Sequence, residues 1–326
     1  MKLPYSGIPI PCPLCYEQDH TVVSTRDRDH SPLRTVMCHG CGHVFTNPMP
    51  PPEYLQAYYS STYRYFYKGT RTPKLKHIYR AGLRALERIE RLSNYIPPGA
   101  QVFDIGAGGG EFLCLLNKYG YGARGIEPSK SYVDFSRQQY GIKVEPGYVE
   151  TFDMPDSSVD AVTMHHVLEH VADPRDVLTR IKAWLKPLGH VILEVPNLES
   201  RYHSPGRRFH FAHLQNFHRA GLEQLALTCG FNVVDCRLNP STDHINIVLN
   251  NESSEPTENN YYNYYEKAKN ALERHTWLSH NLSIRPYSRL WANILRPLRE
   301  RRELTRLGSP QSGNDVLEAL YRKTNT

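Results

Sequence analysis

The chain has 326 residues, of which 40% are apolar and 22% are charged. This composition is typical of a globular protein and argues against a disordered chain, a collagen-like repeat or a coiled coil. No apolar run approaches the roughly 18 residues of a membrane-spanning helix, and residues 1–13 lack the apolar stretch of a secretory signal. We therefore expect a soluble, cytoplasmic protein with no membrane span.

The net charge of +6 lies mostly in the C-terminal part of the chain. Residues 281–326 hold nine Arg or Lys residues and four Asp or Glu residues, a balance of +5. Because the rest of the chain is nearly neutral, a nucleic acid is not the expected partner.

Residues 1–50 carry two pairs of cysteines, and we expect them to form a small zinc-ribbon domain. The motifs Cys12-Pro-Leu-Cys15 and Cys38-His-Gly-Cys41 are separated by 22 residues. Four thiolates satisfy the tetrahedral coordination of Zn²⁺, and a segment this short gains folding free energy from a metal. His39 and His43 are alternative ligands, and a redox dithiol is the alternative chemistry. The predicted ligands of a structural Zn²⁺ are Cys12, Cys15, Cys38 and Cys41.

The other three cysteines lie in apolar segments. Cys114, Cys229 and Cys236 are expected to be small buried side chains. An odd total of seven cysteines argues against a disulfide framework.

Residues 51–98 are expected to be a helical linker or lid. A tyrosine-rich stretch over residues 58–67 precedes a helical pattern over residues 77–95, and Pro97-Pro98-Gly99 ends the segment. The tyrosines are interpreted either as a lid over a ligand or as ordinary helix packing.

Residues 99–250 alternate between strand and helix patterns. Such alternation indicates an α/β fold with a Rossmann-like, doubly wound parallel sheet. Ser129 and Asp173 are plausible helix N-caps. The predicted strands are 101–105, 123–127, 142–145, 159–164, 189–195, 231–237 and 245–250, and the predicted helices are 111–119, 129–140, 174–185 and 219–229.

Residues 251–326 are predicted to be a polar linker, over residues 251–260, followed by a helical extension. The extension is rich in Tyr and Arg. Its basic run over residues 296–306 is interpreted as a solvated helix face, or alternatively as a region that attracts an acidic substrate such as a nucleotide-sugar.

A glycine-rich turn follows the first strand predicted within residues 99–250. It reads Asp104-Ile-Gly-Ala-Gly-Gly-Gly-Glu111 and lets a ligand touch the backbone beside a helix N-terminus. Glu111 stands where a dinucleotide fingerprint has its third glycine, and its carboxylate would repel a diphosphate. Asp104 can face a sulfonium, and Glu127 at the end of the next strand can accept both ribose hydroxyls. These features fit S-adenosylmethionine, with predicted contacts at Asp104, Gly106, Gly108, Gly110 and Glu127.

On these segments, residues 99–250 resemble class I S-adenosylmethionine-dependent methyltransferases of the small-molecule type. The resemblance is carried by Val102-Phe-Asp-Ile-Gly-Ala-Gly-Gly-Gly110, by Val167-Leu-Glu-His-Val-Ala-Asp-Pro174, and by residues 125–128, 159–164, 185–189 and 230–231. The N-terminal cysteine-containing segment, which ends with residues 42–48, is similar to that of methyltransferases that carry a zinc ribbon, including sugar C-methyltransferases. The resemblance implies a seven-stranded sheet whose last strand is antiparallel.

The resemblance also implies further contacts with the cofactor. Ala107, Pro128 and His165 join the expected cofactor site on this basis. Many relatives have an acidic residue after the position of Gly147 that contacts the adenine. Here the candidates for that contact are Tyr148, Val149 and Glu150.

Four polar residues follow the fourth predicted strand, at the sheet edge where ligands of such folds bind. They are His165, His166, Glu169 and His170. Methyl transfer requires that the acceptor is positioned and can require that it loses a proton. A histidine suits that proton transfer, so His165, His166 and His170 are the candidate general bases. The alternative is a structural role in the loop, since Leu-Glu-His is a turn in many relatives.

A second divalent metal is an alternative role for the same residues. His166, Glu169 and His170 stand at i, i+3 and i+4, which puts them on one face of a helical turn. His213 or His218 would complete the site. A Glu-x-x-Glu-His arrangement occurs in metal-assisted ubiquinone-pathway and small-RNA O-methyltransferases. Here His166 replaces the first Glu, which disfavours Mg²⁺.

The sequence therefore predicts an S-adenosylmethionine-dependent methyltransferase for a small-molecule acceptor. The acceptor is expected to be a sugar, a nucleotide-sugar or a secondary metabolite, methylated on oxygen or carbon. One alternative is an RNA methyltransferase that grips RNA with the ribbon and the basic tail, and the near-neutral body of the chain disfavours it. The other is an inactive binding scaffold, against which the intact Asp104, glycines and Glu127 argue.

Overall fold

A computed structural model describes residues 5–59, 72–252 and 264–324. The chain forms two compact units, and each unit combines two separate segments. The first unit comprises Met1–Leu55 and Met164–Ser288, and the second comprises Gln56–Thr163 and Arg289–Thr326.

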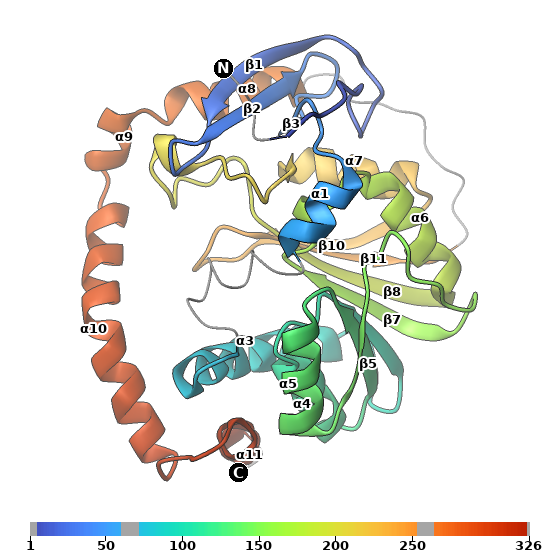
Figure 1. The fold of residues 1–326 in the computed structure, drawn as a ribbon, viewed down its shortest axis with the longest axis vertical. Helices are drawn as coiled ribbons and strands as arrows, with labels where there is room; N and C mark the ends of the chain where they lie inside the picture. Colours follow the sequence, from blue (N-terminus) through green and yellow to red (C-terminus); the bar gives the residue numbers. More distant parts are fainter. Residues whose placement is uncertain (1–4, 60–71, 253–263, 325–326) are drawn as a thin grey trace. The chain divides into compact units, whose positions relative to one another are not determined.

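A seven-stranded, mostly parallel sheet contains the strands predicted for residues 99–250 (Figure 1). Strands β4, β5 and β6 pair in parallel. The last strand, β11, is antiparallel to both of its neighbours, β8 and β10. This topology confirms the Rossmann-like α/β fold. The strand order is β10 (Asn232–Leu238), β11 (Ile245–Asn250), β8 (Leu185–Val195), β7 (Val159–His165), β4 (Gln101–Ile105), β5 (Gly122–Glu127) and β6 (Lys143–Pro146).

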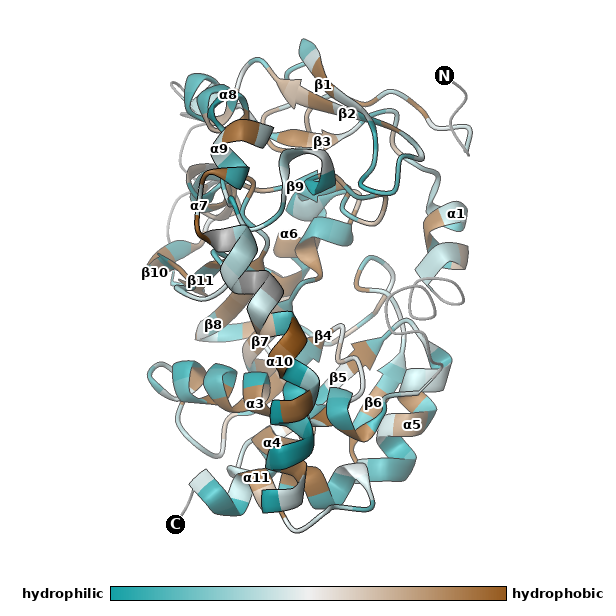
Figure 2. Ribbon diagram, turned by 90° about the vertical axis from the view of Figure 1, so that its left-hand side faces the viewer, coloured by the Kyte–Doolittle hydropathy of each residue, from teal (hydrophilic) through white to brown (hydrophobic). Residues whose placement is uncertain are grey.

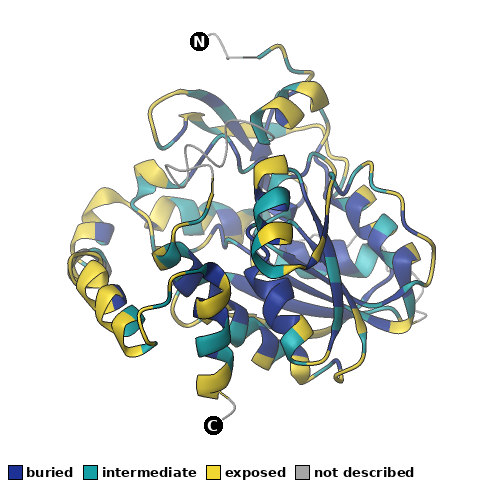
Figure 3. Cartoon of the chain, turned by 60° about the horizontal axis from the view of Figure 1, so that its bottom comes forward, coloured by how far each residue is buried: buried dark blue, intermediate teal, exposed yellow. Residues whose placement is uncertain are grey.

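Burial explains why these segments form a sheet. The strands carry runs of β-branched and aromatic residues, which pack well on a pleated surface. Val102, Phe103, Val162 and Val191 are completely buried. Figure 3 shows the buried residues, in dark blue, concentrated in the strands of this sheet.

In the second unit, three helices and the C-terminal helix surround a shared apolar core. They are α3 (Leu75–Ser93), α4 (Glu111–Lys118), α5 (Lys130–Tyr140) and α11 (Gly313–Thr324). Leu317 is fully buried, and its side chain lies close to Gly82 of α3, where a larger residue would collide with it. Lys118 of α4 forms an ion pair with Glu318 of α11 at 2.5 Å. Helix α11 is therefore part of the core of this unit.

In the first unit, a four-stranded antiparallel sheet carries the N-terminal cysteine motifs. Its order is β1 (His20–Arg26), β2 (Pro32–Cys38), β3 (Val44–Thr46) and β9 (Gln215–Asn216). The last of these strands was not predicted, because two residues give no periodic pattern. Leu33, Met37 and Val44 pack with Ala268 of α8 (Tyr264–Arg274), which lies beside this sheet in Figure 1.

The remaining helices are short, with the exception of α10. They are α1 (Pro52–Ala57), α6 (Pro174–Trp184), α7 (Arg219–Thr228), α9 (Trp277–Asn281) and α10 (Arg285–Arg306). Helix α10 alternates hydrophobic and hydrophilic stretches (Figure 2) and exposes Trp291 and Leu298. Within its basic run, Glu300 is buried and binds Arg80, and Glu303 binds Arg306 at 2.6 Å. None of the helices among the described residues is both long and apolar enough to cross a membrane.

Several predicted boundaries shift by a few residues. Strand β8 begins at Leu185, four residues before the predicted start at Gly189, and α6 ends at Trp184. The side chain of Asp173 accepts hydrogen bonds from the backbone N–H groups of Arg175 and Asp176, which confirms it as an N-cap. Ser129 stands at the N-cap of α5 without a capping bond from its side chain. The predicted lid falls largely on residues 60–71 and the polar linker on residues 253–263, outside the described residues.

Candidate functional site

The glycine-rich turn lies in the second unit, between β4 and α4. Gly106, Gly108 and Gly110 all have positive φ values, of 77°, 59° and 85°. Only glycine adopts this left-handed region without steric cost. The backbone N–H groups of Gly106 and Ala107 both donate to the carbonyl of Ile126, at 2.9 Å. The turn is therefore fixed against the end of β5, as the motif predicts.

Glu127 connects the second strand end to the same turn. Its side chain is 2% exposed. Its Oε2 accepts a hydrogen bond from the Gly108 N–H at 2.9 Å, and its Oε1 accepts one from the Ser129 N–H at 3.1 Å. A carboxylate oxygen can accept more than one hydrogen bond, and the hydroxyls of a ribose are suitable donors.

Asp104 is held in the same way at the end of β4. It is 4% exposed, and its Oδ1 accepts a hydrogen bond from the Thr163 hydroxyl at 2.7 Å. The structure thus gathers Asp104, Gly106, Ala107, Gly108 and Glu127 around one turn, and Gly110 opens the following helix as its left-handed N-cap residue.

The other residues of the predicted cofactor site are positioned less tightly. Pro128 is half-buried directly after Glu127, and His165 is half-buried at the end of β7. Of the three candidates for the adenine contact, Val149 is buried, Glu150 is half-buried, and the Tyr148 hydroxyl donates to the carbonyl of Gln56 at 3.0 Å.

The four N-terminal cysteines come together in the first unit. The Sγ atoms of Cys12 and Cys41 are 3.5 Å apart, those of Cys15 and Cys38 are 3.4 Å apart, and all four lie within 4.8 Å of one another. Four thiolates at about 2.3 Å from one Zn²⁺ would be about 3.8 Å apart. The cluster is therefore about the size of a tetrahedral Zn²⁺ site with four thiolate ligands. Burial raises the pKa of the Cys12 thiol, and a bound cation would reverse that effect.

The two histidines considered as alternative zinc ligands have other contacts. His43 is buried and its Nε2 donates to Oε1 of Gln215 at 2.8 Å. His39 forms a hydrogen bond with the Thr21 hydroxyl at 2.5 Å. Neither displaces a cysteine from the cluster.

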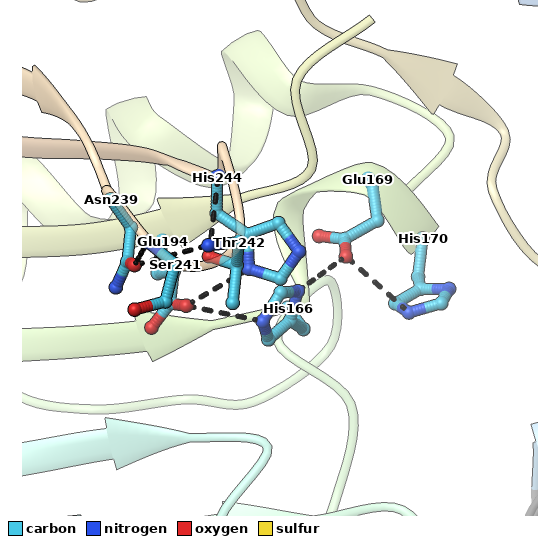
Figure 4. A network of polar contacts seen from close by, with 8 residues as sticks. All are labelled: His166, Glu169, His170, Glu194, Asn239, Ser241, Thr242 and His244. Atoms are coloured by element: carbon cyan, nitrogen blue, oxygen red, sulfur yellow. Dashed lines mark hydrogen bonds and ion pairs between the residues drawn. The ribbon is translucent and has the colours of Figure 1, made fainter. Parts of the chain in front are cut away.

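A second group of polar residues surrounds His166 in the first unit (Figure 4). His166 Nδ1 lies 3.4 Å from Oε1 of Glu169, and His166 Nε2 lies 3.4 Å from Oε1 of Glu194. Glu194 Oε1 also lies 3.1 Å from Nδ1 of His244. His166 therefore stands between two carboxylates, one from the turn after β7 and one from β8.

The structure groups the predicted metal ligands differently from the sequence pattern. Glu169 and His170 converge with His213, whereas His166 converges with Glu194 and His244. Of the two candidates to complete the site, His213 lies in the first of these groups, and His218 lies in neither. Its Nδ1 accepts the Gly221 N–H at 3.1 Å, so His218 is the N-cap of α7. Capping satisfies an otherwise unpaired backbone donor at the helix start.

Glu194 and His244 were missed by the sequence analysis. The signal for Glu194 was available, because a carboxylate interrupts the apolar strand Val-Ile-Leu-Glu-Val at its carboxyl end. No sequence signal pointed to His244. It lies in the turn between β10 and β11, immediately before Ile245, and far in the sequence from the other residues of the group.

The electrostatics of this group differ from one histidine to the next. Burial by itself lowers the pKa of His166, but Glu169 and Glu194 outweigh it and raise that pKa to about 9. Burial by itself raises the pKa of Glu169, but the neighbouring His166 and His170 outweigh burial, so this pKa is lowered. Burial lowers the pKa of His213 well below its usual range.

Parts of the chain are similar to known proteins. The family model described as a methyltransferase domain matches residues 76–235. An uncharacterized 37.1 kDa protein in transposon TN4556 of Streptomyces fradiae is 32% identical over 110 residues, which cover 32% of this chain and 32% of that protein. A ubiquinone biosynthesis O-methyltransferase of Coxiella burnetii (strain Dugway 5J108-111) is 30% identical over 104 residues, which cover 30% of this chain and 44% of that protein. The chain thus spans less than half the length of these curated relatives.

Among solved structures, the PH0226 protein from Pyrococcus horikoshii OT3 is similar with a TM-score of 0.47 and 20% identity. That similarity covers 58% of this chain and 98% of that chain. Residues 76–235, just under half of the chain, are thus similar to a methyltransferase domain.

Proposed function

We propose that the protein transfers a methyl group from S-adenosylmethionine to a small-molecule acceptor. The proposed acceptor is a sugar, a nucleotide-sugar or a secondary metabolite, methylated on oxygen or carbon. The observation that carries the proposal is the glycine-rich turn fixed by Glu127, together with the methyltransferase family match over residues 76–235.

In this proposal the cofactor supplies a methyl carbon that is already activated by the sulfonium. The chain's own residues bind and orient it. Glu127 accepts the ribose hydroxyls, the turn over Gly106–Gly110 allows close approach to the backbone, and Asp104 places a negative charge at the end of β4.

The acceptor loses a proton during O-methylation, and a histidine after β7 is the proposed general base. His165, His166 and His170 remain the candidates. The ring of His170 is held at its Nδ1, which lies 2.6 Å from the carbonyl oxygen of Ala212. An Nδ1–H donated to that carbonyl leaves Nε2 as the proton acceptor.

We also propose that Cys12, Cys15, Cys38 and Cys41 bind a structural Zn²⁺. Four protein ligands leave no open coordination position, so this ion would stabilise the N-terminal sheet and take no part in the reaction.

The test uses S-adenosylmethionine labelled in its methyl group. Extracts are incubated with the wild-type protein or with Gly106→Arg, whose side chain would fill the cofactor turn. We expect a labelled small molecule with the wild type and none with the variant. A labelled product of nucleic-acid size would instead support the RNA methyltransferase, and no labelled product at all would contradict the proposed activity.

A further inference from the structure

Three side chains from separate segments converge on one point in the first unit (Figure 4). His166 follows β7, Glu194 lies in β8, and His244 precedes β11. One ligand atom from each lies within 4.8 Å of the others. Neither the family match nor the cysteine cluster accounts for this group.

The distances within the group are those of ligands around one metal ion. His166 Nε2 and His244 Nδ1 lie 3.4 and 3.1 Å from Oε1 of Glu194. Ligands bound at about 2.0–2.1 Å with tetrahedral or octahedral angles are about 2.9–3.4 Å apart. Two of the three ligand-to-ligand distances are therefore those expected around a bound ion, and the two imidazole nitrogens lie within 4.8 Å of each other.

The backbone around the group fixes two of the three ligands. His166 has a φ of 57°, a strained value for a residue with a Cβ, and its N–H donates to the carbonyl of Glu194 at 2.8 Å. His244 is held by the turn after β10, in which Asn239 Oδ1 accepts the N–H groups of Ser241 and Thr242 at 2.8 and 3.2 Å. Strain that the surrounding structure maintains is typical of functional positions.

Glu169 provides the outer support that metal-binding histidines usually have. It is 1% exposed, and neither of its carboxylate oxygens makes a hydrogen bond among the described residues. Its Oε1 faces Nδ1 of His166 at 3.4 Å, opposite the nitrogen that faces Glu194. A carboxylate behind a ligating histidine orients the ring and increases its basicity.

We infer that His166 Nε2, Glu194 and His244 Nδ1 bind one divalent transition-metal ion, with Glu169 as the positioning residue for His166. Two imidazoles and one carboxylate suit Zn²⁺, Fe²⁺ or Mn²⁺ better than Mg²⁺. Three protein ligands leave coordination positions open, and His166 and His244 are 34% and 27% exposed. A ligand with a hydroxyl or carboxylate oxygen would occupy those positions. That such a ligand is the methyl acceptor rests on the proposed function, whereas the ion site does not.

The experiment counts zinc in the full-length protein after equilibrium dialysis against micromolar Zn²⁺. We expect Glu194→Gln and His244→Ala each to hold one Zn²⁺ fewer per chain than the wild type. Glu169→Gln should retain the ion with an affinity about 10-fold weaker, as expected for an outer-shell change. Glu199→Gln, at an exposed position shortly after β8, is the matched control and should hold as many ions as the wild type.

Two results would overturn the inference. One is an equal zinc count in the wild type, Glu194→Gln and His244→Ala. The other is loss of the ion in Glu169→Gln with retention in Glu194→Gln, which would move it to Glu169, His170 and His213. Titration of S-adenosylmethionine into the same samples separates the two proposals, because the proposed function fails if no sample binds it, whatever the zinc count.

Discussion

Glu127 is the residue on which the proposed cofactor site depends most directly. Its two oxygens hold the turn through Gly108 and Ser129. We predict that Glu127→Ala weakens binding of S-adenosylmethionine at least 10-fold, or about 1.4 kcal/mol, because it removes both the ribose acceptor and the support of the turn. Isothermal titration calorimetry measures the change.

The matched control for this prediction is Glu145→Gln, on the exposed side of β6. Its affinity should equal that of the wild type. Equal affinities for Glu127→Ala and Glu145→Gln would contradict the assigned role of Glu127.

His275 provides a test of buried electrostatics in the first unit. It is 2% exposed, its Nδ1 accepts from Arg208 at 2.7 Å, and its Nε2 lies 3.2 Å from Nδ1 of His280. Burial, with a contribution from Arg208, lowers its pKa to about 4. Since an unfolded histidine has a pKa near 6.5, the unfolded chain binds the extra proton first, and stability falls as the pH drops from 6.5 to 4.

We therefore predict that His275→Gln has a free energy of unfolding that depends less on pH between 6.5 and 4 than that of the wild type. Urea denaturation at a series of pH values measures this slope. His203→Gln, at an exposed position, should keep the wild-type slope. If the slope for His275→Gln is as steep as that of the wild type, the lowered pKa of His275 in the folded chain is contradicted.

Residues with a local signature were predictable from the sequence, and residues joined only by the fold were not. The four cysteines and the residues of the glycine-rich turn can be recognised because they lie a few residues apart in short motifs. Glu194 and His244 are 50 residues apart and meet only because β8 and β11 pair. The sequence left His213 and His218 as alternatives because a histidine that caps a helix and one that faces a carboxylate look alike in a sequence.

At the scale of elements, α11 tests whether the C-terminal extension stabilises the second unit. Leu317 is fully buried beside α3. We predict that Leu317→Ala lowers the free energy of unfolding by about 2–4 kcal/mol, the usual cost of a cavity left by a deleted Leu side chain. Leu298→Ala, at a position 68% exposed, should change it by less than about 0.5 kcal/mol. Urea denaturation distinguishes the two, and similar values for both variants would contradict the packing of α11.

Most elements were predictable because their apolar periodicity and their caps are local properties. The strands of the central sheet fall within a few residues of the predicted ranges. Strand β8 starts early because its first part also pairs with Asn251: the Leu188 N–H donates to the Asn251 carbonyl at 3.3 Å, and the Asn251 N–H donates to the Gly189 carbonyl at 2.7 Å. Strand β9 exists only because β3 pairs with it, and no local pattern encodes that partner.

At the scale of the whole molecule, the cysteine cluster should stabilise one part of the chain without affecting the other. The knuckle of Cys12 and Cys15 is tied to α6 within the first unit, where Arg175 donates to the carbonyl of Leu14 at 2.6 Å. The four predicted domains, 1–50, 51–98, 99–250 and 251–326, remain a prediction alongside the two compact units.

We predict that removal of zinc by a strong chelator, or by Cys38→Ser, increases hydrogen exchange over residues 12–46 and leaves residues 101–127 protected. The reason is that the small N-terminal sheet has little apolar core of its own. Cys229→Ser, outside the cluster, should keep the wild-type pattern. Unchanged exchange over residues 12–46 after chelation would show that the metal contributes nothing to this fold.

Every proposal about the reaction requires that the turn between β4 and α4 binds S-adenosylmethionine. Isothermal titration of S-adenosylmethionine into the purified full-length chain measures this binding. We expect one bound molecule per chain, displaced by S-adenosylhomocysteine and not by NAD⁺. Absence of binding, or binding of NAD⁺ at that turn instead, would contradict it.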